Sequence, residues 1–125
     1  MYRISVHKDF ISQHFLIGGD WGAENLLHSH HYVLDLELAG ATLDQHNYLV
    51  DIIDIETMLG ETIAYYRDRT LNDLPEFKDT NPSIERFSRI LCETFNQRIQ
   101  AKNISRIATR LWETPTSWAG YEMER

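Results

Sequence analysis

The segment HSHHYVLDLELA, residues 28–39, decides the fold class of this 125-residue chain. From Tyr32 to Ala39, apolar residues alternate with polar ones, and the apolar side consists of Leu34, Leu36 and Leu38. Alternation of this kind predicts a half-buried strand in an antiparallel sheet. The three histidines at the start of the segment directly precede this strand, so a candidate functional cluster lies at the beginning of the strand.

The rest of the chain supplies further elements on both sides of this strand. Ahead of it we expect an extended strand and then a glycine-containing loop. After it, helical spacing of apolar residues predicts two helices, the second capped by Asn81, and two more strands follow. The expected ranges are strand 2–16, helix 54–66, helix 81–103, strand 104–113 and strand 118–123. This order predicts an α+β fold in which two helices cover one face of a four-stranded antiparallel sheet. Its open edges favour pairing with other subunits.

Length and composition exclude several classes of protein. A chain of this length is expected to form one domain over residues 1–125, because smaller pieces could not bury a core. The net charge of −7 and the lack of a basic run argue against nucleic-acid binding. The single cysteine, Cys92, excludes an internal disulfide and is expected to pack in the second helix. Neither a signal peptide nor a stretch of membrane-spanning length is found, so we expect a cytoplasmic protein with no membrane partner.

The histidine cluster suggests a metal site. His28 and His30 are two residues apart, so in an extended chain their side chains point to the same side, while His31 points away. A catalytic zinc ion commonly takes three protein ligands and keeps a fourth position open. His14 on the neighbouring expected strand is the nearest candidate for the third ligand, and the alternatives are His7 and His46. An H-x-H pair on its own is also compatible with a plain surface cluster.

Several short motifs, taken together and in this order, resemble the 6-pyruvoyl-tetrahydropterin synthase family, which includes the 6-carboxytetrahydropterin synthases. Each motif alone is weak, and the combination is specific. They are Phe10-Ile11-Ser12-Gln13-His14, His28-Ser29-His30-His31-Tyr32, Ile52-Ile53-Asp54, Leu71-Asn72-Asp73, Asn81-Pro82-Ser83-Ile84-Glu85 and Trp112-Glu113-Thr114.

The resemblance implies a concrete site. It implies the tunnelling fold (T-fold), with the same sheet and two helices, and assembly into homotrimers or homohexamers. His14, His28 and His30 match the family's zinc ligands. Glu113 matches the carboxylate that grips the pterin, whose adjacent N–H groups suit a paired, charge-assisted contact. Ser83 falls where the family has hydroxyl residues near the pterin.

The chain departs from the family pattern at two places. Glu24 stands where the family usually has its catalytic cysteine. It resembles a branch that carries glutamate there and cleaves the side chain of dihydroneopterin triphosphate; a buried glutamate can act as a general base. Arg67 and Asp68 stand where the family has an Asp-His pair, so that acid–base relay is absent and Asp68 becomes a candidate to assist Glu24. Arg67 and Arg69 either contact a substrate phosphate or carboxylate or are solvated charges.

These features predict a zinc-dependent lyase that acts on the side chain of 7,8-dihydroneopterin triphosphate, by elimination or carbon–carbon cleavage. The pathway would be pterin, folate or queuosine biosynthesis. The missing Asp-His pair supports an alternative, a catalytically inactive homologue that still binds zinc and a pterin. A third interpretation is a structural oligomer whose histidines hold no metal.

Overall fold

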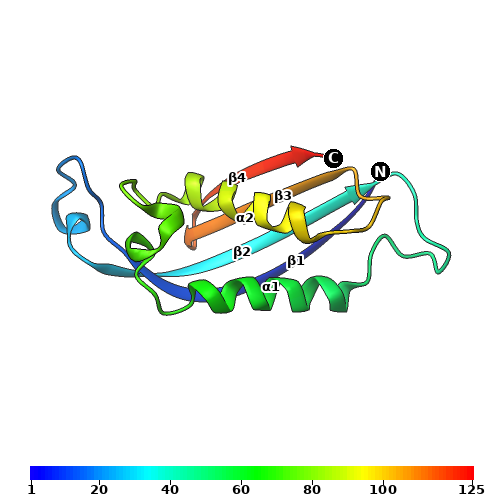
Figure 1. The fold of residues 1–125 in the computed structure, drawn as a ribbon, viewed down its shortest axis with the longest axis horizontal. Helices are drawn as coiled ribbons and strands as arrows, with labels where there is room; N and C mark the ends of the chain where they lie inside the picture. The colour runs from blue at the N-terminus through cyan, green and yellow to red at the C-terminus, as the bar shows by residue number, and fades with distance from the viewer.

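A four-stranded antiparallel sheet forms one layer of the molecule (Figure 1). The computed structural model describes residues 1–125, and its strands lie side by side in chain order. They are β1 (Tyr2–His14), β2 (His28–Gly40), β3 (Arg106–Thr114) and β4 (Ser117–Glu124). The predicted antiparallel sheet is therefore confirmed. β2 begins at His28, four residues before the alternation of leucines and acids, so His28, His30 and His31 are all part of the ladder with β1.

Two helices form the second layer and lie on the same face of the sheet (Figure 1). They are α1 (Ile52–Tyr66) and α2 (Ile84–Arg98), which packs on β3 and β4 while α1 packs on β1. Asp51 caps α1 by accepting a hydrogen bond from the N–H of Ile53, so Asp54 lies inside the first turn. The predicted arrangement of two helices on one face is confirmed. In this structure, no helix is long and apolar enough to span a membrane.

The limits of α2 differ from the prediction. Asn81 is not the cap: Ser83 has extended backbone angles, and its hydroxyl accepts a hydrogen bond from the N–H of Arg86 at 3.1 Å. The helix ends at Arg98 and not near Asn103, because Ile99 leaves the helical conformation. The Asn103 amide instead donates to backbone carbonyls of the segment between β2 and α1.

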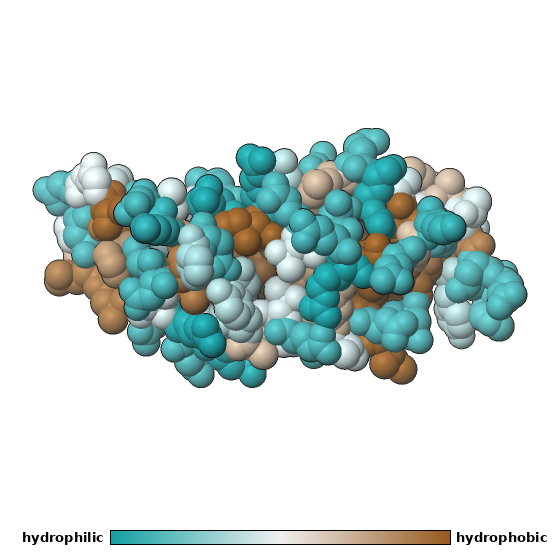
Figure 2. Space-filling model, in the orientation of Figure 1, coloured by the Kyte–Doolittle hydropathy of each residue, from teal (hydrophilic) through white to brown (hydrophobic).

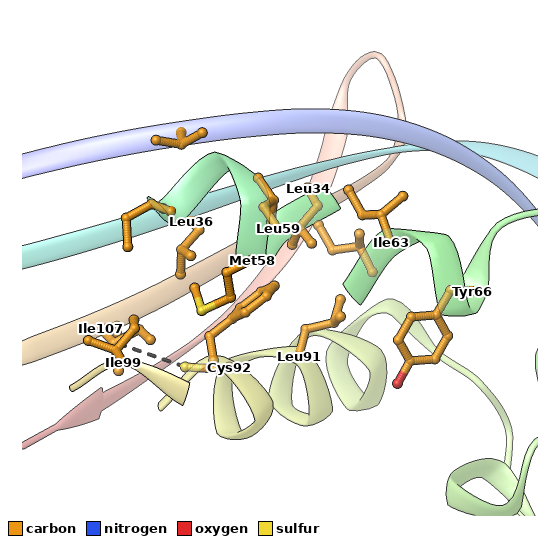
Figure 3. Packing of buried hydrophobic residues seen from close by; sticks show 14 of the residues in the cluster. Leu34, Leu36, Met58, Leu59, Ile63, Tyr66, Leu91, Cys92, Ile99 and Ile107 are labelled. Atoms are coloured by element: carbon orange, nitrogen blue, oxygen red, sulfur yellow. Dashed lines mark hydrogen bonds between the residues drawn. The ribbon is translucent and has the colours of Figure 1, made fainter. Parts of the chain in front are cut away.

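The core lies between the sheet and the helices (Figure 3). One side of every strand faces it, and on β2 this side carries Tyr32, Leu34, Leu36 and Leu38, all fully buried. Cys92 of α2 packs here as predicted, and its Sγ lies 3.8 Å from the carbonyl oxygen of Ile107. Burial raises the pKa of this thiol to about 11, so it stays protonated and unreactive near neutral pH.

The sheet edges are less open than the sequence suggested. After α1 the chain returns along part of β1, where the Asp68 N–H donates to the Ile11 carbonyl at 2.7 Å and the Gln13 N–H donates to the Arg69 carbonyl at 2.9 Å. Gln13 and Thr70 form an isolated parallel bridge. The His14 end of β1 is therefore covered by the chain's own backbone. The outer edge of β4 has no partner strand in the monomer.

Candidate metal and pterin site

Three histidines meet at the end of the β1–β2 ladder. His14 lies directly opposite His28, and His30 lies opposite Ser12, two residues further along each strand. The ring centroids of His14 and His28 are 4.5 Å apart, those of His14 and His30 4.8 Å, and those of His28 and His30 4.9 Å. One potential ligand atom of each lies within 4.8 Å of the others. His14 continues the core-facing row of β1, and His28 and His30 continue that of β2, so the cluster sits at the end of the core.

Hydrogen bonding at His28 leaves one nitrogen free for a metal. Nδ1 lies 2.8 Å from the carbonyl oxygen of Leu26, and a carbonyl can only accept, so Nδ1 carries the proton. Nε2 then presents a lone pair, and this atom is buried without a hydrogen-bond partner. A buried acceptor with no partner is unfavourable unless something binds it. Neutral imidazole nitrogens are standard zinc ligands, so the three residues fit a metal ion.

Burial keeps His14 neutral. Desolvation, and then the neighbouring His30 and His28, lower the pKa of His14 from 6.5 to about 4. Its ring is therefore uncharged at neutral pH, which is the form that a metal requires. The His14 ring is therefore available to bind a cation.

This shift predicts how the stability of the metal-free protein depends on pH. Between pH 6.5 and about 4 the unfolded chain binds a proton at His14 that the folded chain does not, so the free energy of unfolding falls as the pH drops through this window. The contribution is fully present above pH 6.5. Urea midpoints of metal-free wild type and His14→Gln at pH 7 and pH 5 measure it. The wild type should lose more stability than the variant, and equal losses would contradict the assignment.

The other histidines lie away from this cluster. His7 is on the opposite face of the sheet, where Asp35 is its register partner. His46 is exposed in the segment between β2 and α1. His31 also faces outward, with Nε2 2.6 Å from a carboxylate oxygen of Asp9. Of the three candidates for the third ligand, the structure brings only His14 to His28 and His30.

Glu24 lies on the loop that leads into β2. Its short 3-10 turn, Gly22–Asn25, ends at Leu26, whose carbonyl orients His28. The Glu24 side chain is exposed, and its backbone carbonyl accepts a hydrogen bond from the N–H of Leu16 at 3.0 Å. Glu24 and the candidate metal ligand His28 are thus carried by one short, internally bonded segment.

Two asparagines hold the start of this loop, and their role could not be seen in the sequence. The Asn72 amide accepts the N–H of Phe15 at 3.0 Å and donates to the Phe15 carbonyl at 2.8 Å. Asn81 makes the same pair of bonds to Ile17, at 2.7 and 3.1 Å. Each amide satisfies both polar groups of one backbone residue, as a neighbouring strand would. These contacts fix the path of the chain between His14 and the Glu24 turn.

Asp68 contacts β1 through its backbone and not through its carboxylate. Its side chain is exposed and its φ is +59°, an uncommon conformation for a residue other than glycine. Arg67 is exposed beside it. The guanidinium of Arg69 lies over the ring of Tyr65, 5.0 Å from its centroid.

Glu113 lies at a bulge near the end of β3 and is half-buried. It lines a cavity of about 450 Å³ on the outward face of the sheet, the face opposite the three-histidine cluster, together with His31, Val33, Trp112, Thr114 and Pro115. Burial, and second the charge of Glu113, raise the pKa of Tyr32, the core residue beside His14. The oxygen of Ser83 is used in capping α2, which leaves its hydroxyl proton available.

Comparison with known proteins agrees with this architecture. The sequence profile of the 6-pyruvoyl tetrahydropterin synthase family matches residues 3–124. The chain is 28% identical to a 6-carboxy-5,6,7,8-tetrahydropterin synthase from Haemophilus influenzae, over 98% of this chain and 99% of that protein. Among solved structures, the Caenorhabditis elegans 6-pyruvoyl tetrahydropterin synthase aligns with a TM-score of 0.84 at 18% identity, covering 98% of this chain and 96% of that one.

A second similar structure is a Plasmodium vivax 6-pyruvoyltetrahydropterin synthase in which a catalytic glutamate was replaced by alanine. It aligns with a TM-score of 0.83 at 12% identity, over 99% of this chain and 98% of that one. At these identities the structures show the shared T-fold, and the sequence profile shows the family. The chain is a member of the 6-pyruvoyl tetrahydropterin synthase family.

Proposed function

We propose that this chain is a zinc-dependent lyase acting on the side chain of 7,8-dihydroneopterin triphosphate, by elimination or carbon–carbon cleavage, in pterin, folate or queuosine biosynthesis. The observation that carries the proposal is the cluster of His14, His28 and His30, with its buried and unpartnered nitrogen. Family membership supports a pterin as the substrate class.

Zinc held by the three histidines would keep a fourth coordination position open and act there as a Lewis acid on a side-chain oxygen of the substrate. Glu113 is proposed to hold the pterin ring, because a carboxylate can accept two adjacent N–H groups at once. Ser83 is proposed to donate its remaining hydroxyl proton to the ring. Together these contacts would fix the reacting carbon relative to the metal.

We assign the proton transfers to Glu24, with Asp68 assisting. Glu24 belongs to the 3-10 turn that ends at Leu26, and the Leu26 carbonyl orients the ring of His28. The backbone of Glu24 is therefore held close in the chain to the proposed metal ligand His28. A glutamate is a catalytic residue in the Plasmodium vivax neighbour. Asp68 lies on the segment bonded to β1 at Ile11, three residues before His14.

A specific observation supports the alternative, an inactive homologue that binds zinc and a pterin. Glu24 and Asp68 are both exposed in the monomer, and neither carboxylate is held by a hydrogen bond that would orient it. In this alternative the histidines and Glu113 retain their binding roles, and only turnover is lost.

Product analysis separates the two functions. Zinc-loaded protein is incubated with 7,8-dihydroneopterin triphosphate, and the pterins are separated by chromatography and identified by mass spectrometry. We expect a new 6-substituted pterin, and we expect Glu24→Gln to lower kcat by about 10²- to 10⁴-fold, the usual contribution of a general base. Asp20→Asn in the same loop is the control and should keep its activity. Bound zinc and bound pterin without any product would support the inactive homologue.

We also propose assembly into a homotrimer or homohexamer through the sheet edges. The outer edge of β4 lacks a partner strand, and the loop between β1 and β2 exposes apolar side chains at one end of the molecule (Figure 2). These side chains are Ile17, Trp21, Leu26 and Leu27. The single, buried and unpaired Cys92 suits a reducing, cytoplasmic setting. Light scattering of the purified protein gives the number of subunits.

A further inference from the structure

The hydroxyl of Tyr32 is a polar atom on a residue that otherwise belongs to the apolar core. Tyr32 is fully buried, and its ring packs on Phe10 at 5.2 Å and on Phe87 at 5.7 Å between centroids. A phenylalanine would make the same ring contacts, and a buried hydroxyl is costly unless it is hydrogen-bonded. The Tyr32 oxygen lies 3.0 Å from Nδ1 of His14. The Tyr32 hydroxyl therefore has its hydrogen-bond partner in the histidine cluster and not in the apolar core.

This hydrogen bond determines which nitrogen of His14 is free. Because Nδ1 is engaged with Tyr32, Nε2 is the atom that remains for a metal. In that tautomer Nδ1 carries the proton and donates it to the Tyr32 oxygen. The carbonyl of Leu26 has the same relation to Nδ1 of His28. Partners of this kind set the tautomer and the ring orientation of metal-binding histidines.

We propose that Tyr32 is a positioning residue for the metal site, whose hydroxyl holds the His14 ring in the tautomer and orientation that present Nε2 to the ion. The inference deepens the proposed function and rests on it for the metal. Tyr32 itself does not touch the metal or the substrate. It links the aromatic core to the cluster, so packing around Phe87 and the geometry of His14 depend on one side chain.

Tyr32→Phe removes the hydroxyl and keeps the ring, and Tyr66→Phe is a matched control. Tyr66 is also buried and packs on Phe87, at 4.8 Å, but its hydroxyl donates to Glu76 at 2.9 Å and not to a histidine. Zinc affinity is measured by competition with a chelating dye, and the ligand geometry by the visible absorption of the cobalt-substituted protein. We expect Tyr32→Phe to weaken zinc binding by about 10- to 100-fold and to change the cobalt spectrum. Tyr66→Phe should change neither.

Two background variants show whether the effect passes through His14. Tyr32→Phe should weaken the residual zinc binding of His30→Ala, where His14 is present, and should have no effect in His14→Ala. Equal zinc affinity of wild type and Tyr32→Phe, or an equal loss in both backgrounds, would overturn the inference and leave the proposed function standing. A wild-type protein that binds no zinc would overturn both.

Discussion

His28→Ala is expected to weaken zinc binding by at least about 100-fold, more than the loss of an outer hydrogen-bonding partner usually costs. The substitution removes the proposed ligand whose buried Nε2 has no hydrogen-bond partner, and the two remaining histidines cannot complete a three-ligand site. Zinc content after dialysis and a competition titration measure the effect.

His31→Ala is the matched control for this variant. His31 lies in the same strand but faces the opposite side of the sheet and pairs with Asp9. Its removal should leave the zinc affinity unchanged. If His31→Ala and His28→Ala lost zinc to the same extent, the cluster on the core-facing side would not be the binding site.

Phe87→Ala is expected to lower the free energy of unfolding by about 3–5 kcal/mol, the range for truncating a large buried aromatic residue. Phe87 of α2 is fully buried at the centre of an aromatic cluster that joins both helices to the sheet. Its ring contacts those of Phe10, Tyr32, Tyr66 and Phe77. Each of these four neighbouring rings comes from a different strand, helix or turn. Movement of one neighbour alone therefore cannot fill the cavity that the substitution leaves.

Urea unfolding of the metal-free protein measures this loss, with Tyr48→Ala as the control. Tyr48 is 64% exposed, so its truncation should change the stability by no more than about 0.5 kcal/mol. A loss below about 1 kcal/mol for Phe87→Ala would contradict the packing described for the core.

The fold could be predicted from the sequence where periodicity is strong. The alternation on β2 and the apolar spacing on α2 gave the correct element types and order, and the antiparallel sheet followed from them. The error at Asn81 has a physical cause. A side-chain amide can cap a helix or bind a distant backbone equally well, and the partner at Ile17 is 64 residues away in the chain. Local sequence does not contain that contact.

The site could be predicted in part. The H-x-H spacing placed His28 and His30 on one side, but the third ligand depended on strand register, which sets His14 opposite His28. Sequence patterns also gave no reason to separate Tyr32 from the leucines that follow it, since all are buried on one face. Its polar role depends on the position of one oxygen atom beside His14. The same limit applies to Asn72, whose contact with Phe15 appears only in three dimensions.

A crystal structure of the zinc-loaded protein with a bound 6-substituted pterin tests the central claim most directly. The account predicts a zinc ion, identified by its anomalous signal, about 2.0–2.1 Å from one nitrogen each of His14, His28 and His30. It also predicts the N–H edge of the pterin on the carboxylate of Glu113, with the pterin side chain reaching the metal. A zinc ion bound elsewhere, or a pterin held away from Glu113, would contradict it.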